Sequence, residues 1–415
     1  MNVYLLATLD TKGPEATLMR DRLRALGVDV VVVDTGSSGE PTVAGDVSRE
    51  QVFQAAGTSL EAIRRRRDRG QAVTQAAAGA AALVREAFRA ERLDGVLALG
   101  GSAGTTIGTA AMRALPLGVP KLMVSTLGSG QVRQYVGDKD ILMFNSVVDI
   151  AGINRISRRI LNNAAAAMAG MVLDRASDST DDRPLVTATM FGVTTPCVER
   201  ARAILEQAGY EVLVFHATGN GGQAMESLIA EGVIAGVLDI TTTELADELV
   251  GGILTAGPDR LTAAGRHGVP QVVSVGATDM VNFGPPETVP DKFRNRQFYQ
   301  HNPTVTLMRT TAKENAKLGA EIGRKVAAGQ GPAAILLPQR GVSAIDRAGE
   351  AFDDPAARKA LLDAVRQNCG QVELLDLDLH INDDAFAEAA ARKLIQLMRT
   401  AAPSASLKPE NRPAP

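Results

Sequence analysis

The feature that most constrains the fold of this chain is the regular alternation of short apolar runs with longer stretches of helical composition. The runs in its first part are "NVYLLATL", "VDVVVVDTG", "DGVLALGG" and "VPKLMVST". Short apolar runs separated by helices are typical of parallel strands that are buried on both faces of a sheet. The alternation therefore predicts a doubly wound, Rossmann-like α/β fold.

The same pattern occurs a second time along the chain. Residues 5–39 align with residues 186–222, and "DGVLALGGSAGT" lies over "AGVLDITTTELA". The first copy carries an insertion that includes the arginine-rich segment "RRRRDRG". The repetition predicts two parallel-sheet domains, related by internal duplication, that face a cleft where a ligand would bind. We expect a first domain over 1–175, a second over 184–400 after a polar linker, and a disordered tail over 401–415.

Composition excludes several classes of protein. The chain has 415 residues, of which 45% are hydrophobic and 22% charged, with a net charge of -3; this is typical of a soluble globular protein. Its apolar runs are shorter than the ~20 residues of a membrane helix, and the N-terminus lacks the basic region of a signal peptide. The two distant cysteines, Cys197 and Cys369, favour a reducing, cytoplasmic location. Aromatic residues make up only 3%, which argues against a nucleic-acid partner bound by base stacking.

Glycine and hydroxyl residues follow each of the first four predicted strands. The segments are "TLDTKG", "DTGSSG", "GGSAGTT" and "STLGSG". In doubly wound sheets, ligands bind outside the carboxyl ends of the strands. The third segment matches neither a Walker loop nor the dinucleotide-binding spacing, so alone it is also consistent with a simple tight turn. Four such segments, with Lys12 among them, favour a phosphate-bearing or nucleotide ligand in the first domain.

The corresponding segments of the second domain carry acidic residues instead. Helix capping and acid–base or Mg²⁺-binding chemistry both account for them; capping is favoured for Glu244, and both remain open for Asp279. The four histidines lack metal-ligand spacing, so we expect no metal centre. His301 is a candidate for acid–base chemistry because histidine titrates near neutral pH. Asp279 and His301 are thus the candidate catalytic residues.

Motifs along nearly the whole chain, to about residue 400, resemble one known family. They are "ATLDTKG", "LALGGSAGTT", "VSTLGSG", "DMVNFGPPETVP", "QHNPTVTLMRTT" and "LPQRGVSAIDRAGEAFDDP". They are similar to the ATP-binding domain family named for the tomato mosaic virus resistance protein. The resemblance implies a two-domain, doubly wound protein that binds ATP in its first domain and forms a homodimer. The chain looks like a stand-alone bacterial member, of an uncharacterised kind, without the barrel domain of the plant protein. We do not expect the virus-binding activity to carry over.

The resemblance and the loop positions together assign an ATP site, with Mg²⁺ as a companion of the nucleotide. Its predicted residues are Thr8, Asp10, Lys12, Gly100, Gly101, Ser102, Gly104, Thr105, Ser125, Thr126 and Gly128. One alternative is an enzyme that acts on a small phosphorylated or carboxylate metabolite in the cleft, through Asp279 and His301. Another is a module that binds a protein partner through the arginine-rich insertion. For that segment a solvated helix face is the favoured interpretation, and a phosphate-facing arm or a partner surface is the minority interpretation.

Overall fold

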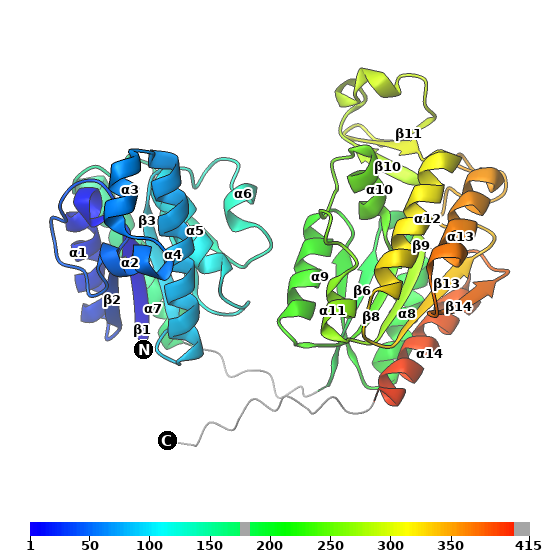
Figure 1. The fold of residues 1–415 in the computed structure, drawn as a ribbon, viewed down its shortest axis with the longest axis horizontal. Helices are drawn as coiled ribbons and strands as arrows, with labels where there is room; N and C mark the ends of the chain where they lie inside the picture. The colour runs from blue at the N-terminus through cyan, green and yellow to red at the C-terminus, as the bar shows by residue number, and fades with distance from the viewer. Residues whose placement is uncertain (175–182, 402–415) are drawn as a thin grey trace. The chain divides into compact units, whose positions relative to one another are not determined.

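A computed structural model of the chain describes residues 1–174 and 183–401. The chain divides into two compact units, Met1–Ser179 and Thr180–Pro415 (Figure 1). The linker predicted near residue 175 and the tail from residue 402 onward lie outside the described residues.

The first unit is built on one parallel sheet. Its strand order is β2-β1-β3-β4-β5, with bounds β1 Asn2–Ala7, β2 Asp29–Asp34, β3 Gly95–Gly100, β4 Lys121–Ser125 and β5 Leu142–Asn145. Its helices are α1 Leu9–Ala25, α2 Arg49–Ala55, α3 Leu60–Arg66, α4 Arg69–Arg89, α5 Ser102–Arg113, α6 Arg133–Val136 and α7 Arg155–Leu173.

Both faces of this sheet are covered by helices, as Figure 1 shows. Alternate residues of β1 point to opposite faces: Leu5 packs with α1 and α7, whereas Leu6 packs with α2, α4 and α5. Because both faces are buried, the strands are apolar along their whole length instead of alternating with polar residues. The predicted doubly wound, parallel α/β fold is therefore confirmed for this unit.

The second unit contains a six-stranded parallel sheet and a small antiparallel sheet. The parallel sheet has the order β14-β13-β9-β8-β6-β7, and the antiparallel sheet has the order β10-β12-β11. The strands are β6 Leu185–Met190, β7 Glu211–His216, β8 Ile234–Thr241, β9 Gln271–Gly276, β10 Met280–Phe283, β11 Phe298–Asn302, β12 Val305–Arg309, β13 Ala333–Pro338 and β14 Glu373–Leu377. The helices are α8 Thr195–Gln207, α9 Asn220–Ala230, α10 Thr243–Val250, α11 Ala263–His267, α12 Ala312–Ala327, α13 Pro355–Asn368 and α14 Asp384–Thr400.

The first five strands of each unit, counted in chain order along its parallel sheet, follow the same spatial order. When the strands of each parallel sheet are numbered from one in chain order, the spatial order is 2-1-3-4-5 in the first unit. In the second unit, where β6 counts as strand 1 and β14 as strand 6, it is 2-1-3-4-5-6. In the second unit α8 and α14 cover one face of the parallel sheet, while α10, α12 and α13 pack on the other. Of the helices that the structure describes, none is both long enough and apolar enough to cross a membrane.

Candidate functional site

A cavity of 390 Å³ lies at the carboxyl ends of β1, β2 and β3 in the first unit. The chain passes from β1 to β2 on one side and then returns to β3 on the other, so β1 and β3 flank the switch point of the sheet, where doubly wound proteins bind ligands. The cavity is lined by Thr8, Asp10, Thr11, Lys12, Thr35, Ser37, Ser38, Arg69, Ala72, Val73, Ala76, Gly100, Gly101, Ser102, Ala103, Gly104, Ile107 and Asp149.

The N-terminus of α5 forms one wall of this cavity. The helix begins at Ser102, directly after β3, and no side chain caps it at Gly101. The first N–H groups of a helix have no partner within the helix, and the helix dipole makes this end positive. The turn from β3 into α5 is therefore suited to hold an anion such as a phosphate.

Two glycines of this turn are required by close backbone contacts. A Cβ on Gly104 would lie 2.9 Å from the carbonyl oxygen of Leu99, and a Cβ on Gly100 would lie 2.8 Å from Gly104 Cα. Gly101 is different, since a Cβ there would meet nothing nearer than Thr126 Oγ1 at 3.7 Å. Part of the glycine pattern thus reflects the tight strand-to-helix turn, whatever ligand the cavity takes.

The first turn of α1 forms a second wall. Sequence analysis placed "TLDTKG" in a loop, but α1 begins at Leu9, so Asp10 and Lys12 belong to the helix, which is kinked at Lys12. The N–H of Leu9 donates to the buried carboxylate of Asp34 at 3.1 Å, which fixes the start of the helix at the end of β2. Thr8, Asp10 and Lys12 consequently reach the cavity from one helical turn.

The loop after β2 is held in place by side chains from three helices. Asp10 Oδ2 accepts from the N–H groups of Ser38 and Gly39, each at 3.2 Å. Arg49 of α2 forms a buried ion pair with Asp34 at 2.7 Å and donates to the carbonyl of Gly39. Arg64 of α3 donates to the carbonyl of Ser37 at 3.0 Å. Because Ser37 and Ser38 line the cavity, these contacts shape its wall.

The arginine-rich segment is exposed, as the solvated-face interpretation predicts, but it is not one continuous helix face. The helix α3 ends at Arg66, Arg67 has a left-handed conformation with a φ of 52°, and Asp68 caps α4 through a bond to Gln71 N. Arg69, the first residue of α4, lines the cavity.

Four predicted site residues lie outside the set that lines the cavity: Thr105, Ser125, Thr126 and Gly128. The hydroxyls of Thr105 and Ser125 are buried and bonded to each other at 2.7 Å, which ties the start of α5 to the end of β4. A Cβ on Gly128 would lie 2.9 Å from Asn145 Cα. Thr105 and Ser125 thus support the start of α5, whereas Gly128 packs against β5.

Arg69, Asp149 and the apolar side chains of α4 line the cavity but were absent from the predicted site. Arg69 and α4 belong to the insertion, and Asp149 follows β5. Only the arginine cluster was a visible signal, and a phosphate-facing arm is the minority interpretation there, beside the favoured solvated helix face.

In the second unit, the chain's own side chains fill the corresponding position. Glu244 and Ala103 are each the second residue of the helix that follows the third strand of their sheet. Glu244 is buried, and its Oε1 accepts from the N–H groups of Gly219 at 2.7 Å and Gly222 at 3.1 Å. Arg260, also buried, donates to Glu244 Oε2 at 2.6 Å. Burial raises the pKa of Glu244, against the opposing charge of Arg260.

The capping interpretation of Glu244 was therefore wrong. Thr242 occupies the N-cap of α10 without a side-chain capping bond, and its hydroxyl donates to the carbonyl of Ser274 at 3.1 Å. Arg260 also donates two hydrogen bonds to the carboxylate of Asp239, from Nη1 to Oδ2 at 2.5 Å and from Nη2 to Oδ1 at 2.7 Å. Glu244 belongs to a buried ion-pair network that joins distant segments of the second unit.

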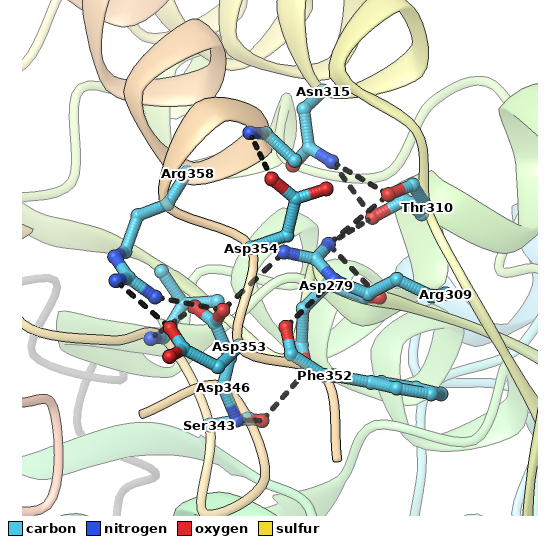
Figure 2. A network of polar contacts seen from close by, with 12 residues as sticks. Asp279, Arg309, Thr310, Asn315, Ser343, Asp346, Phe352, Asp353, Asp354 and Arg358 are labelled. Carbon is cyan, nitrogen blue, oxygen red and sulfur yellow. Dashed lines mark hydrogen bonds and ion pairs between the residues drawn. The ribbon is translucent and has the colours of Figure 1, made fainter. Parts of the chain in front are cut away.

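Asp279 lies in a separate buried network, shown in Figure 2. Its Oδ2 accepts from Ser343 Oγ at 2.8 Å. Nearby Asp346 accepts from Arg358 at 2.8 Å and Arg309 at 3.3 Å, and Arg309 also donates to the main-chain carbonyl of Asp279 at 3.2 Å. Burial, with the charge of Asp346 as a second cause, raises the pKa of Asp279 to about 7, although Arg309 acts in the opposite direction.

The structure does not bring Asp279 and His301 together. Asp279 directly precedes Met280, which pairs with Arg309 at the end of β12. His301 is exposed in β11, next to Asn302, which pairs with Val305 at the start of β12. The two candidate catalytic residues therefore lie at opposite ends of β12. Within the described ranges, no group of three or more His, Cys, Asp or Glu side chains is arranged to hold a metal ion.

Comparison with known proteins identifies similar sequences over nearly the whole chain. The model of the uncharacterised protein family UPF0261, N-terminal domain, matches residues 1–177, and that of its C-terminal domain matches residues 183–398. A UPF0261 protein of Clostridium tetani is 50% identical over 95% of this chain and 98% of the relative. One of Rhizobium meliloti is 48% identical over 94% of this chain and 97% of the relative.

A plant protein is also similar. The ToMV resistance protein Tm-1(GCR237) of Solanum lycopersicum is 40% identical over 95% of this chain, which corresponds to 55% of the tomato protein. Among solved structures, UDP-GlcNAc 2-epimerase of Neisseria meningitidis matches with a TM-score of 0.23 and 10% identity, over 66% of this chain and 82% of that one. A similarity of that size carries no argument about this chain.

Proposed function

This chain belongs to the uncharacterised protein family UPF0261, and we propose that its first unit binds ATP, or a closely related nucleotide with its Mg²⁺, in the cavity at the ends of β1, β2 and β3. The observation that carries the proposal is the uncapped N-terminus of α5, which borders a cavity that also contains Lys12. A helix N-terminus and a lysine together attract phosphate.

The other walls of the cavity suit the remainder of a nucleotide. Thr8, Thr35 and Ser38 offer hydroxyls that can bond to phosphate or ribose oxygens, and Ala72 and Ile107 offer an apolar surface that suits a base or the carbon face of a sugar. Asp10 and Asp149 are carboxylates of the kind that bind Mg²⁺ together with a nucleotide's phosphates.

The second unit supports a phosphate site in the first unit, because a carboxylate side chain occupies the corresponding position there. At the position of Ala103 it has Glu244, whose carboxylate is bound by two backbone N–H groups and by Arg260. The shared strand order supports an internal duplication, in which one copy of the site keeps a cavity and the other is filled by a side-chain anion. We therefore infer one nucleotide per chain.

The substitution Ala103→Glu tests the proposal by copying the second unit's residue into the first. A carboxylate on this wall repels phosphate and takes up space, so we expect ATP affinity to fall at least tenfold, a loss of about 1.4 kcal/mol or more. The matched control is Thr106→Glu, which adds the same charge one turn further along α5, outside the residues that line the cavity.

Isothermal titration with ATP and MgCl₂ measures both variants and the wild type, and circular dichroism confirms that each is folded. We expect Thr106→Glu to keep wild-type affinity. ATP binding that is equally strong in Ala103→Glu and the wild type would contradict the proposed site. Phosphate release followed over hours in the same samples tests the alternative of an enzyme, and light scattering tests the expected homodimer.

A further inference from the structure

The arginine run, Arg64 to Arg67 with Arg69, meets the cavity at two points. Arg69 lines the cavity directly. Arg64 lies in the last turn of α3 and donates through Nε to the carbonyl of Ser37, a residue that also lines the cavity. Arg66 is exposed and lies outside the lining set that the structure describes, and Arg65 forms an ion pair with Glu61.

On the premise that the cavity binds a nucleotide, we propose that it selects nucleoside di- and triphosphates over monophosphates, with Arg69 binding the terminal phosphate and Arg64 positioning the loop after β2. This assigns two different roles to the arginine run, neither of which requires a protein partner.

The proposal rests first on where the positive groups stand. Lys12 and the N-terminus of α5 belong to elements that follow β1 and β3. Arg69 belongs to α4, a third element of the same cavity wall. We expect a single phosphate at the start of α5 to leave Arg69 without a phosphate to bind, and a chain of two or three phosphates to reach both, because the two lie on different elements of the cavity wall.

The chemistry of arginine also fits a terminal phosphate. Its planar guanidinium donates two parallel hydrogen bonds to a phosphate, and the terminal group of a nucleotide carries the most negative charge. Arg69 is exposed at the first position of α4, so its side chain is free to approach a ligand. Asp10 also lines the cavity, and its Oδ2 accepts from the N–H groups of Ser38 and Gly39.

Arg64 acts through another residue and does not contact the ligand. The loop that contains Ser37 is held on one side by Asp10 and on the other by Arg49 and Arg64. Loss of the Arg64 bond releases the carbonyl of Ser37 and loosens one wall of the cavity. This change weakens every ligand that uses the wall, irrespective of its number of phosphates.

The test is a titration of ATP, ADP and AMP into the full chain at one fixed salt concentration. We expect the wild type to bind ATP and ADP at least tenfold more tightly than AMP. Arg69→Gln should lower ATP affinity about tenfold or more and AMP affinity less than about twofold, as expected for one charge-assisted bond. Arg66→Gln removes the same charge from the same run and should change each affinity less than about twofold.

The positioning role has its own controls. Arg64→Gln should weaken ATP, ADP and AMP by one common factor, and Arg64→Lys, which can still donate to the Ser37 carbonyl, should restore most of the affinity. Arg65→Gln, one position along, should leave all three affinities unchanged.

The outcomes separate this inference from the proposed function. Equal binding of ATP and AMP, or equal losses in Arg69→Gln and Arg66→Gln, would overturn the inference while nucleotide binding stands. A wild type that binds none of the three nucleotides would overturn both.

Discussion

Asp279 provides a prediction that can be worked out from its surroundings. The side chain is fully buried beside Asp346, and these two causes raise its pKa to about 7. In the unfolded chain the pKa returns to about 3.9. Between these two values the folded state holds a proton that the unfolded state has lost, so the second unit becomes less stable as the pH rises.

The size of this loss follows from the pKa. Each pH unit below the folded pKa contributes about 1.36 kcal/mol, so the two units from pH 5 to pH 7 amount to roughly 2–3 kcal/mol, with little further loss at pH 8. Asp279→Asn removes the titration and keeps an oxygen that accepts from Ser343 Oγ. We therefore expect the variant to gain roughly 2–3 kcal/mol relative to the wild type between pH 5 and pH 8.

The assay is urea denaturation of the full chain at pH 5 and pH 8, followed by circular dichroism, with the wild type and variant compared at each pH. Hydrogen exchange of the amides of β9 and β13 assigns the transition to the second unit. A wild type and variant that lose the same stability over this range would refute the argument that Asp279 is protonated in the folded protein at pH 5.

Two further predictions concern buried contacts. Arg260→Ala leaves Glu244 buried without its cationic partner and should destabilise the second unit by about 3–5 kcal/mol, measured by urea denaturation; a loss below about 1 kcal/mol would contradict the importance of that ion pair. Gly104→Ala forces a methyl group against the carbonyl of Leu99 and should lower the free energy of unfolding by about 1–3 kcal/mol. Gly170→Ala lies inside α7, where a Cβ would meet nothing within 4 Å, and should raise the free energy of unfolding by about 0.5–1 kcal/mol. Opposite signs for these two variants in thermal melts are the expected result, and equal effects would contradict it.

The strands and much of the candidate site could be predicted from the sequence because parallel strands impose simple rules. Apolar runs such as Val30 to Val33 can be buried on both faces, and the carboxyl ends of neighbouring strands share one edge of the sheet. Thr8 and Lys12 therefore meet Gly101 at one cavity, although Gly101 is far from both in the chain.

The remainder depends on contacts that no local pattern records. Thr105 and Ser125 look like phosphate ligands in sequence, but their hydroxyls bond to each other behind the cavity. The segment that contains Glu244 has the local pattern of a helix cap, and its real partner, Arg260, comes from the loop before α11. Arg69 belongs to an insertion whose packing on the strand ends is set by tertiary structure.

The most direct test of the central claim is to observe the start of α5 while ATP binds. The account predicts that, in a nuclear magnetic resonance titration of the full chain with ATP and MgCl₂, the amide signals of Ser102, Ala103 and Gly104 shift strongly, because a phosphate accepts from these N–H groups. The signals of Thr243 and Glu244, at the corresponding position of the second unit, should stay in place. Signals of α5 that do not move at saturating ATP would contradict the account.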